Sequence, residues 1–95
     1  MWKKSILIVP TQLIVRKEQF LQNVSKKFEE CVEDVYSESS LQTMVRLTYE
    51  SLKYEYEFLG ESKVEGLSLR EVNSIIEKEA NKVLKQIPYI VKNKN

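Results

Sequence analysis

The sequence predicts an all-α fold, a compact three-helix bundle with an N-terminal arm laid across it. Two glycines and two prolines among 95 residues are too few for the tight turns of a β-rich domain. Apolar side chains recur every three or four residues over two long segments, as they do on the buried face of a helix. The composition, 42% hydrophobic and 31% charged, is typical of a globular chain, and we expect residues 1–95 to form a single domain. The predicted arm comprises Trp2 to Val9.

The first predicted helix runs from Thr11 or Val15 to about Tyr36. Its apolar stripe consists of Ile14, Leu21, Val24, Phe28, Cys31 and Val35, and Leu13, Phe20 and Val32 widen it. Cys31 is the only cysteine and lies within this stripe, so it should be a buried, unreactive core residue. A lone cysteine excludes an intrachain disulfide and favours a reducing compartment, which for this chain we expect to be the cytoplasm.

The last predicted helix begins after Ser68 and ends at Pro88. Ser68 and Glu71 have the spacing of a capping box, and Leu67 with Val72 has the spacing of a hydrophobic staple. Its apolar face contains Val72, Ile75, Ile76, Ala80, Val83, Leu84 and Ile87.

The middle segment, residues 41–59, fits two structures. As a helix it has Ser39 as N-cap and Gly60 beyond its end, with one face made of Leu41, Val45, Thr48, Leu52, Tyr56 and Leu59. As a hairpin over residues 45–58 it would give an α+β fold, a βαββαβ sandwich with further strands at Ser5–Val9 and Tyr89–Val91. We favour the helix, because the hairpin turn at Glu50 to Lys53 would have no typical turn residue.

Catalytic groupings are missing from the sequence. The absence of histidine removes the usual general base, the usual nucleophile pairs and the common zinc sites. The carboxylate pairs Glu29/Glu33 and Glu30/Asp34 are best interpreted as a solvated acidic helix face. We therefore predict no catalytic residues, no metal site and no cofactor, and we expect that the chain is not an enzyme.

Three apolar residues of the middle segment suggest a binding surface. On a helix, Leu47, Tyr54 and Phe58 stand at positions i, i+7 and i+11, on a flank away from the main stripe. This flank is either covered by the other helices or exposed as a patch for a partner. The second interpretation predicts Leu47, Tyr54 and Phe58 as partner-binding residues.

The function predicted from these observations is protein–protein interaction, with the chain forming a homo-oligomer. The size and helical class would suit an accessory protein of a phage or plasmid, an inhibitor, or an immunity factor. A formal charge of +1 gives no reason to expect nucleic acid as the partner, and no apolar run is long enough to span a membrane.

The runner-up prediction is a small DNA-binding regulator. The segment Gly66-Leu67-Ser68-Leu69-Arg70-Glu71-Val72 is similar to the Gly-Phe-Ser-Leu-x-Glu-Ile stretch of regulators of the mercury-resistance type. The resemblance covers these seven residues and implies a helix-turn-helix. The sequence departs from that pattern because the helical periodicity continues through Ala80 without a turn, and no recognition helix follows.

Overall fold

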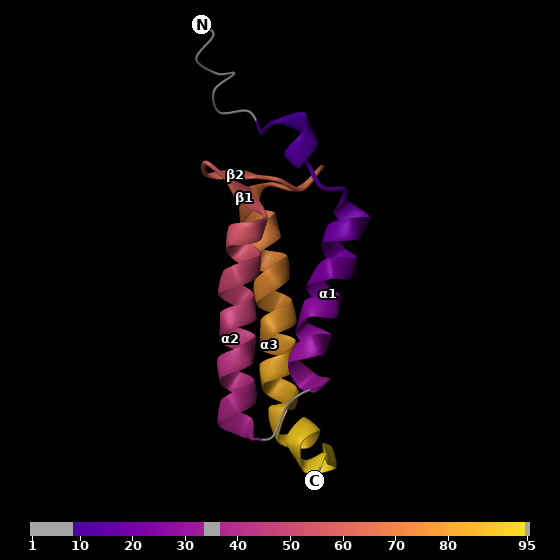
Figure 1. Cartoon of the computed structure of the whole chain (residues 1–95), viewed down its shortest axis with the longest axis vertical. Helices are drawn as coiled ribbons and strands as arrows, with labels where there is room; N and C mark the ends of the chain where they lie inside the picture. The colour runs from indigo at the N-terminus through magenta and orange to yellow at the C-terminus, as the bar shows by residue number, and fades with distance from the viewer. Residues whose placement is uncertain (1–8, 34–36, 95) are drawn as a thin grey trace, which may run out of the picture.

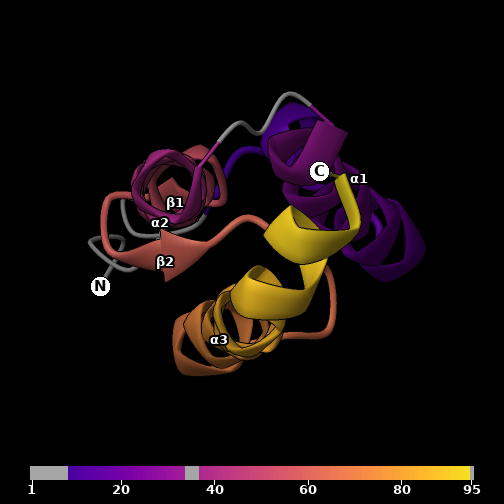
Figure 2. The same cartoon turned by 90° about the horizontal axis from the view of Figure 1, so that it is seen from below.

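The computed structural model describes the backbone of residues 9–33 and 37–94, and side chains through residue 90. In these residues three helices lie side by side in a bundle, and a short hairpin closes one end (Figure 1). The view along the bundle places α1, α2 and α3 at the corners of a triangle (Figure 2). The predicted helical bundle is therefore confirmed at this level. Most of the predicted arm, residues 2–8, lies outside the described residues, and Val9 is buried.

The helix α1 (Lys17–Glu33) begins later than predicted. It follows a single 3-10 turn, η2 (Thr11–Leu13), and an extended stretch in which Val15 forms a parallel bridge to Val64. Its buried residues are Phe20, Val24, Phe28 and Cys31. The predicted stripe is thus wrong in two members, because Ile14 precedes the helix and Leu21 is 40% exposed beside the stripe. The predicted last residues, Val35 and Tyr36, lie outside the described residues.

The helix α2 (Glu38–Glu55) confirms the helical prediction over most of the middle segment and contradicts the hairpin over residues 45–58. Its N-cap is Ser37 rather than the predicted Ser39, because the Ser37 hydroxyl accepts a hydrogen bond from the Ser40 backbone N–H at 3.2 Å. Leu41, Val45 and Leu52 are buried as predicted.

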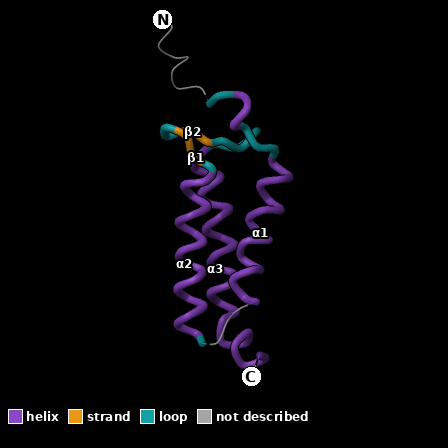
Figure 3. The backbone as a smooth tube through the Cα atoms, viewed as in Figure 1, coloured by secondary structure: helices purple, strands orange, loops and turns teal. Residues whose placement is uncertain are grey.

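A short hairpin follows α2 where the helix was predicted to continue (Figure 3). Its strands are β1 (Glu57–Phe58) and β2 (Glu61–Ser62), which pair antiparallel. The connecting residues Leu59 and Gly60 have φ values of 50° and 82°, the left-handed region that a two-residue hairpin turn requires. Leu59 is therefore 67% exposed at the turn instead of lying on the helical stripe.

The helix α3 (Leu69–Lys94) begins at the predicted capping box. The Ser68 hydroxyl accepts from the Glu71 N–H at 3.1 Å, and the Glu71 carboxylate accepts from the Ser68 N–H at 2.8 Å. The predicted end at Pro88 is wrong, because the helix continues through this residue. Figure 1 shows α3 bent toward its yellow end, as expected where a proline removes one backbone hydrogen bond.

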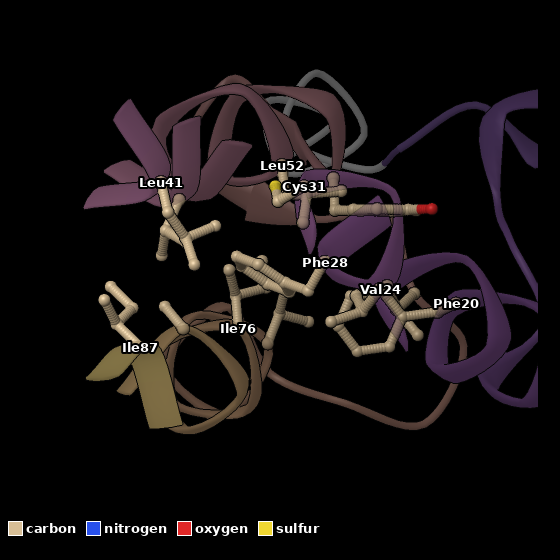
Figure 4. Packing of buried hydrophobic residues seen from close by; sticks show 13 residues of the cluster. Phe20, Val24, Phe28, Cys31, Leu41, Leu52, Ile76 and Ile87 are labelled. Carbon is tan, nitrogen blue, oxygen red and sulfur yellow. The ribbon is translucent and has the colours of Figure 1, made fainter. Parts of the chain in front are cut away.

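The core is a column of apolar side chains from all three described helices, which point toward one another in Figure 4. The largest fully buried side chains include Phe20, Leu41, Leu52, Ile76 and Ile87. At the hairpin end, the Phe20 and Tyr56 rings meet edge to face with centroids 4.8 Å apart. Among the helices of the described residues, none combines the length and apolar content needed to cross a membrane.

Candidate protein-binding surface

Two of the three predicted partner-binding residues lie on the outer face of α2. Leu47 and Tyr54 are two helical turns apart, on the side of the helix away from Val45 and Leu52. The Leu47 side chain is 62% exposed and that of Tyr54 is 79% exposed. The interpretation that this flank is covered inside the bundle is therefore wrong for both residues.

Phe58 does not continue this row. Because α2 ends at Glu55, Phe58 belongs to β1, where it is half-buried. The helical spacing that grouped Phe58 with Leu47 and Tyr54 in the sequence is interrupted by Tyr56, whose φ of −106° and ψ of 20° end the helix. The structure thus leaves Leu47 and Tyr54 as the exposed pair.

An open groove of about 660 Å³ runs between α1 and α2 beside Leu47. Met44, which is 42% exposed, lines it one turn before Leu47, and buried Leu52 lies deeper. We call it the acidic groove, because its charged lining residues are Lys27, Glu30, Glu33 and Glu55. Apolar side chains bordered by charged ones are the arrangement found in protein interfaces.

Cys31 lies at the floor of the acidic groove and is 2% exposed, which confirms the predicted burial. Its Sγ atom is 3.1 Å from the Thr48 hydroxyl and 3.4 Å from the Lys27 carbonyl oxygen. These contacts give the thiol hydrogen-bonding partners within the bundle, and the one with Thr48 links α1 to α2.

A second groove, of about 690 Å³, lies nearer the hairpin. We call it the basic groove, because its charged lining residues are Arg16, Lys26, Lys63 and Glu55. Four side-chain amides also line it, those of Gln12, Gln19, Gln22 and Asn23. Glu55 lines both grooves, so they adjoin on the same side of the bundle.

Tyr56 closes the floor of the basic groove. Its hydroxyl accepts a 2.5 Å hydrogen bond from the Asn23 amide, which also donates to the Glu55 carboxylate at 3.4 Å. Burial raises the pKa of the Tyr56 hydroxyl; the bond from Asn23 lowers it by a smaller amount, and the neighbouring Glu55 charge raises it further. The phenol therefore stays protonated at neutral pH and serves as a polar contact between α1 and the end of α2.

The acidic pairs of α1 are exposed where the structure describes them, at Glu29, Glu30 and Glu33, while Asp34 lies outside the described residues. Across residues 9–33 and 37–94, no group of three or more histidine, cysteine, aspartate and glutamate side chains is placed to hold a metal ion.

The seven residues that resemble a helix-turn-helix opening form the loop and capping box before α3. The helix then continues from Leu69 to Lys94. A helix-turn-helix needs a turn and a second helix after such a start, so this segment does not provide one.

Sequence reasoning missed the basic groove. Arg16 and Lys63 come together because the backbone N–H of Val15 donates to the carbonyl of Lys63 at 2.7 Å, across 48 positions of sequence. Leu59-Gly60 is the signal that could have suggested a turn there, but leucine is an unusual residue at a positive φ.

The chain was also compared with known proteins. No protein-family model, curated protein or solved structure matches the sequence.

Proposed function

We propose that this chain acts by binding another protein through the outer face of α2, with Leu47 and Tyr54 as the anchoring side chains. The observation that carries the proposal is their exposure, 62% and 79%, on a well-formed helix. Large apolar side chains exposed close together are typical of surfaces that become buried on association. Tyrosine is also among the residues enriched where interfaces concentrate their binding energy.

The neighbouring residues extend this surface toward the acidic groove. Met44 is one turn from Leu47 and is 42% exposed at the groove's edge. Phe58 offers a partner less apolar surface, because it is half-buried in the hairpin. An inhibitor, an immunity factor or an accessory subunit each works through a contact of this kind, so the proposal covers these roles.

Site-specific photocrosslinking tests the proposal directly. A benzophenone amino acid replaces Tyr54 in the cells that make the protein, and the adducts formed on irradiation are identified by mass spectrometry. We expect one dominant adduct with a protein, because the Tyr54 side chain would lie inside the contact.

The matched control places the same photoreactive residue at Lys85. This residue is exposed on α3, and its helical position faces away from the buried Ile76 and Ile87. Equal labelling from positions 54 and 85 would contradict a binding surface on α2.

A further inference from the structure

Charge is segregated along the side of the bundle where α1 and α2 meet. In the acidic groove three carboxylates stand against one ammonium group, Lys27. In the basic groove three cationic side chains stand against one carboxylate, Glu55. Glu55 lines both grooves. Without it, the acidic groove has a net formal charge of −1, from Glu30 and Glu33 against Lys27, and the basic groove has one of +3, so the two grooves carry charge of opposite sign.

These two grooves follow one another along α1. The basic groove takes its α1 residues from Gln19 to Lys26, in the half of the helix nearer the hairpin. The acidic groove takes them from Lys27 to Glu33, in the other half. The helices run side by side along the bundle in Figure 1, so this side has a basic end at the hairpin and an acidic end away from it.

We propose that a second copy of this chain binds on this side in an antiparallel arrangement, with the basic groove of each copy facing the acidic groove of the other. The proposal rests on the protein-binding surface proposed for α2, which it shares through Leu47 and Met44, and names a partner for it. A two-fold axis perpendicular to the helices brings the hairpin end of one copy to the opposite end of the other. The face then becomes self-complementary, as an isologous dimer interface must be. A parallel dimer would instead place groups of like charge against each other.

Two exposed apolar side chains lie in the acidic half of this face, where the basic groove of a second copy would meet them. Met44 and Leu47 line the acidic groove on its α2 side and are 42% and 62% exposed. A second copy would cover them while the charged grooves fix its direction. Apolar contacts would supply most of the affinity, and the charges would set the orientation and speed of pairing.

The charge pattern favours a second copy over nucleic acid. A polyanion seated in the basic groove would meet the Glu55 carboxylate there and the Glu30 carboxylate farther along. Repulsion from these carboxylates would oppose the phosphate contacts that nucleic-acid binding depends on. A partner that carries both positive and negative groups can place its positive groups against these carboxylates and so avoids the repulsion.

Two variants each reverse the charge of one groove. Arg16→Glu/Lys63→Glu makes the basic groove acidic, and Glu30→Lys/Ser51→Lys makes the acidic groove basic. Glu30 and Ser51 are exposed and lie on α1 and α2 respectively, while Arg16 is exposed and Lys63 half-buried. Circular dichroism and thermal melting establish that each variant remains folded before its association is measured.

Sedimentation velocity over a range of concentrations then measures dimer formation. We expect the wild-type chain to dimerise, and each variant alone to dissociate with a dissociation constant raised more than about tenfold. An equimolar mixture of the two variants should recover the dimer, because both ends of one are then acidic and both ends of the other are basic.

A wild-type chain that stays monomeric at every concentration would overturn the proposal, while photocrosslinking from position 54 would still test for a different partner. A dimer that both variants retain, or one that the mixture fails to restore, would overturn the antiparallel arrangement. A labelled DNA duplex that binds the wild type, is lost on Arg16→Glu/Lys63→Glu, and is not accompanied by dimer formation would assign the basic groove to nucleic acid instead.

Discussion

The side-chain amide of Asn23 donates a 2.5 Å hydrogen bond to the hydroxyl of Tyr56, joining α1 to the residue that ends α2. The Tyr56 ring is 3% exposed and lies edge to face against Phe20. One residue therefore combines the end of a helix, a core aromatic contact and a polar link between helices. This link also fixes the floor of the basic groove.

Replacing Tyr56 with phenylalanine should lower the free energy of unfolding by about 1 kcal/mol, the usual net value of one intramolecular hydrogen bond. The ring and its contact with Phe20 remain, so the change isolates the hydroxyl. Urea unfolding of both chains measures the difference. Unchanged stability would mean that water replaces the bond from Asn23 without cost.

The raised pKa of Tyr56 predicts a pH dependence of stability. The folded state holds this proton more tightly than the unfolded state, whose tyrosine pKa is near 10.0. Stability from Tyr56 is therefore fully present below pH 10 and is lost as the pH rises through the folded pKa. Unfolding measured from neutral to alkaline pH should show a smaller alkaline loss in Tyr56→Phe than in the wild type. Identical alkaline losses in the two chains would show that Tyr56 is not the group responsible.

The capping box at the start of α3 should contribute measurably to stability. Ser68→Ala removes the acceptor for the Glu71 N–H and should cost about 1 kcal/mol. Ser74→Ala is the matched control, because Ser74 is exposed inside the same helix and alanine is favoured there. Equal effects of the two substitutions on the urea midpoint would argue against the cap.

The turn of the hairpin should be stabilised by replacing Leu59. Its φ of 50° costs a leucine roughly 1 kcal/mol, whereas asparagine tolerates this conformation. Leu59→Asn should therefore raise the free energy of unfolding by up to about 1 kcal/mol, with little loss of packing from a side chain that is 67% exposed.

Gly60→Ala is the opposite control for the same turn. Its φ of 82° is unfavourable for alanine, although no heavy atom beyond the two neighbouring residues lies within 4 Å of where the Cβ would stand. A loss of about 1 kcal/mol would then reflect the backbone alone. Destabilisation by Leu59→Asn would indicate that the leucine side chain contributes packing at the turn.

The helical class could be predicted from the sequence because the apolar residues that recur at helical spacing are the ones that the helices bury. Val24, Phe28 and Cys31 on α1, and Val72 and Ile76 on α3, are buried as their spacing indicates. The capping box was predictable because its two hydrogen bonds are local, between residues three apart.

The ends of the elements were harder to predict, because long-range contacts decide them. The bridge between Val15 and Val64 holds in extended form a stretch whose periodicity suggested helix. Pro88 remains inside α3, where local chemistry alone predicts a stop. For the candidate surface, periodicity placed Leu47 and Tyr54 on a flank of α2. Whether that flank is exposed depends on how the other helices pack against α2, and local sequence spacing does not determine that packing.

The most direct test of the proposed binding surface is the association of the Leu47→Ser/Tyr54→Ser variant. Both side chains are largely exposed, so the variant should keep the helical circular dichroism spectrum and melting temperature of the wild type. Buried interface anchors often cost about 2 kcal/mol or more each when truncated, so self-association or binding of the crosslinked partner should weaken by more than about thirtyfold. Sedimentation velocity of the two chains side by side measures the effect on self-association, and titration with the crosslinked partner measures the effect on binding. A variant that remains folded and associates as tightly as the wild type would contradict a binding surface on the outer face of α2.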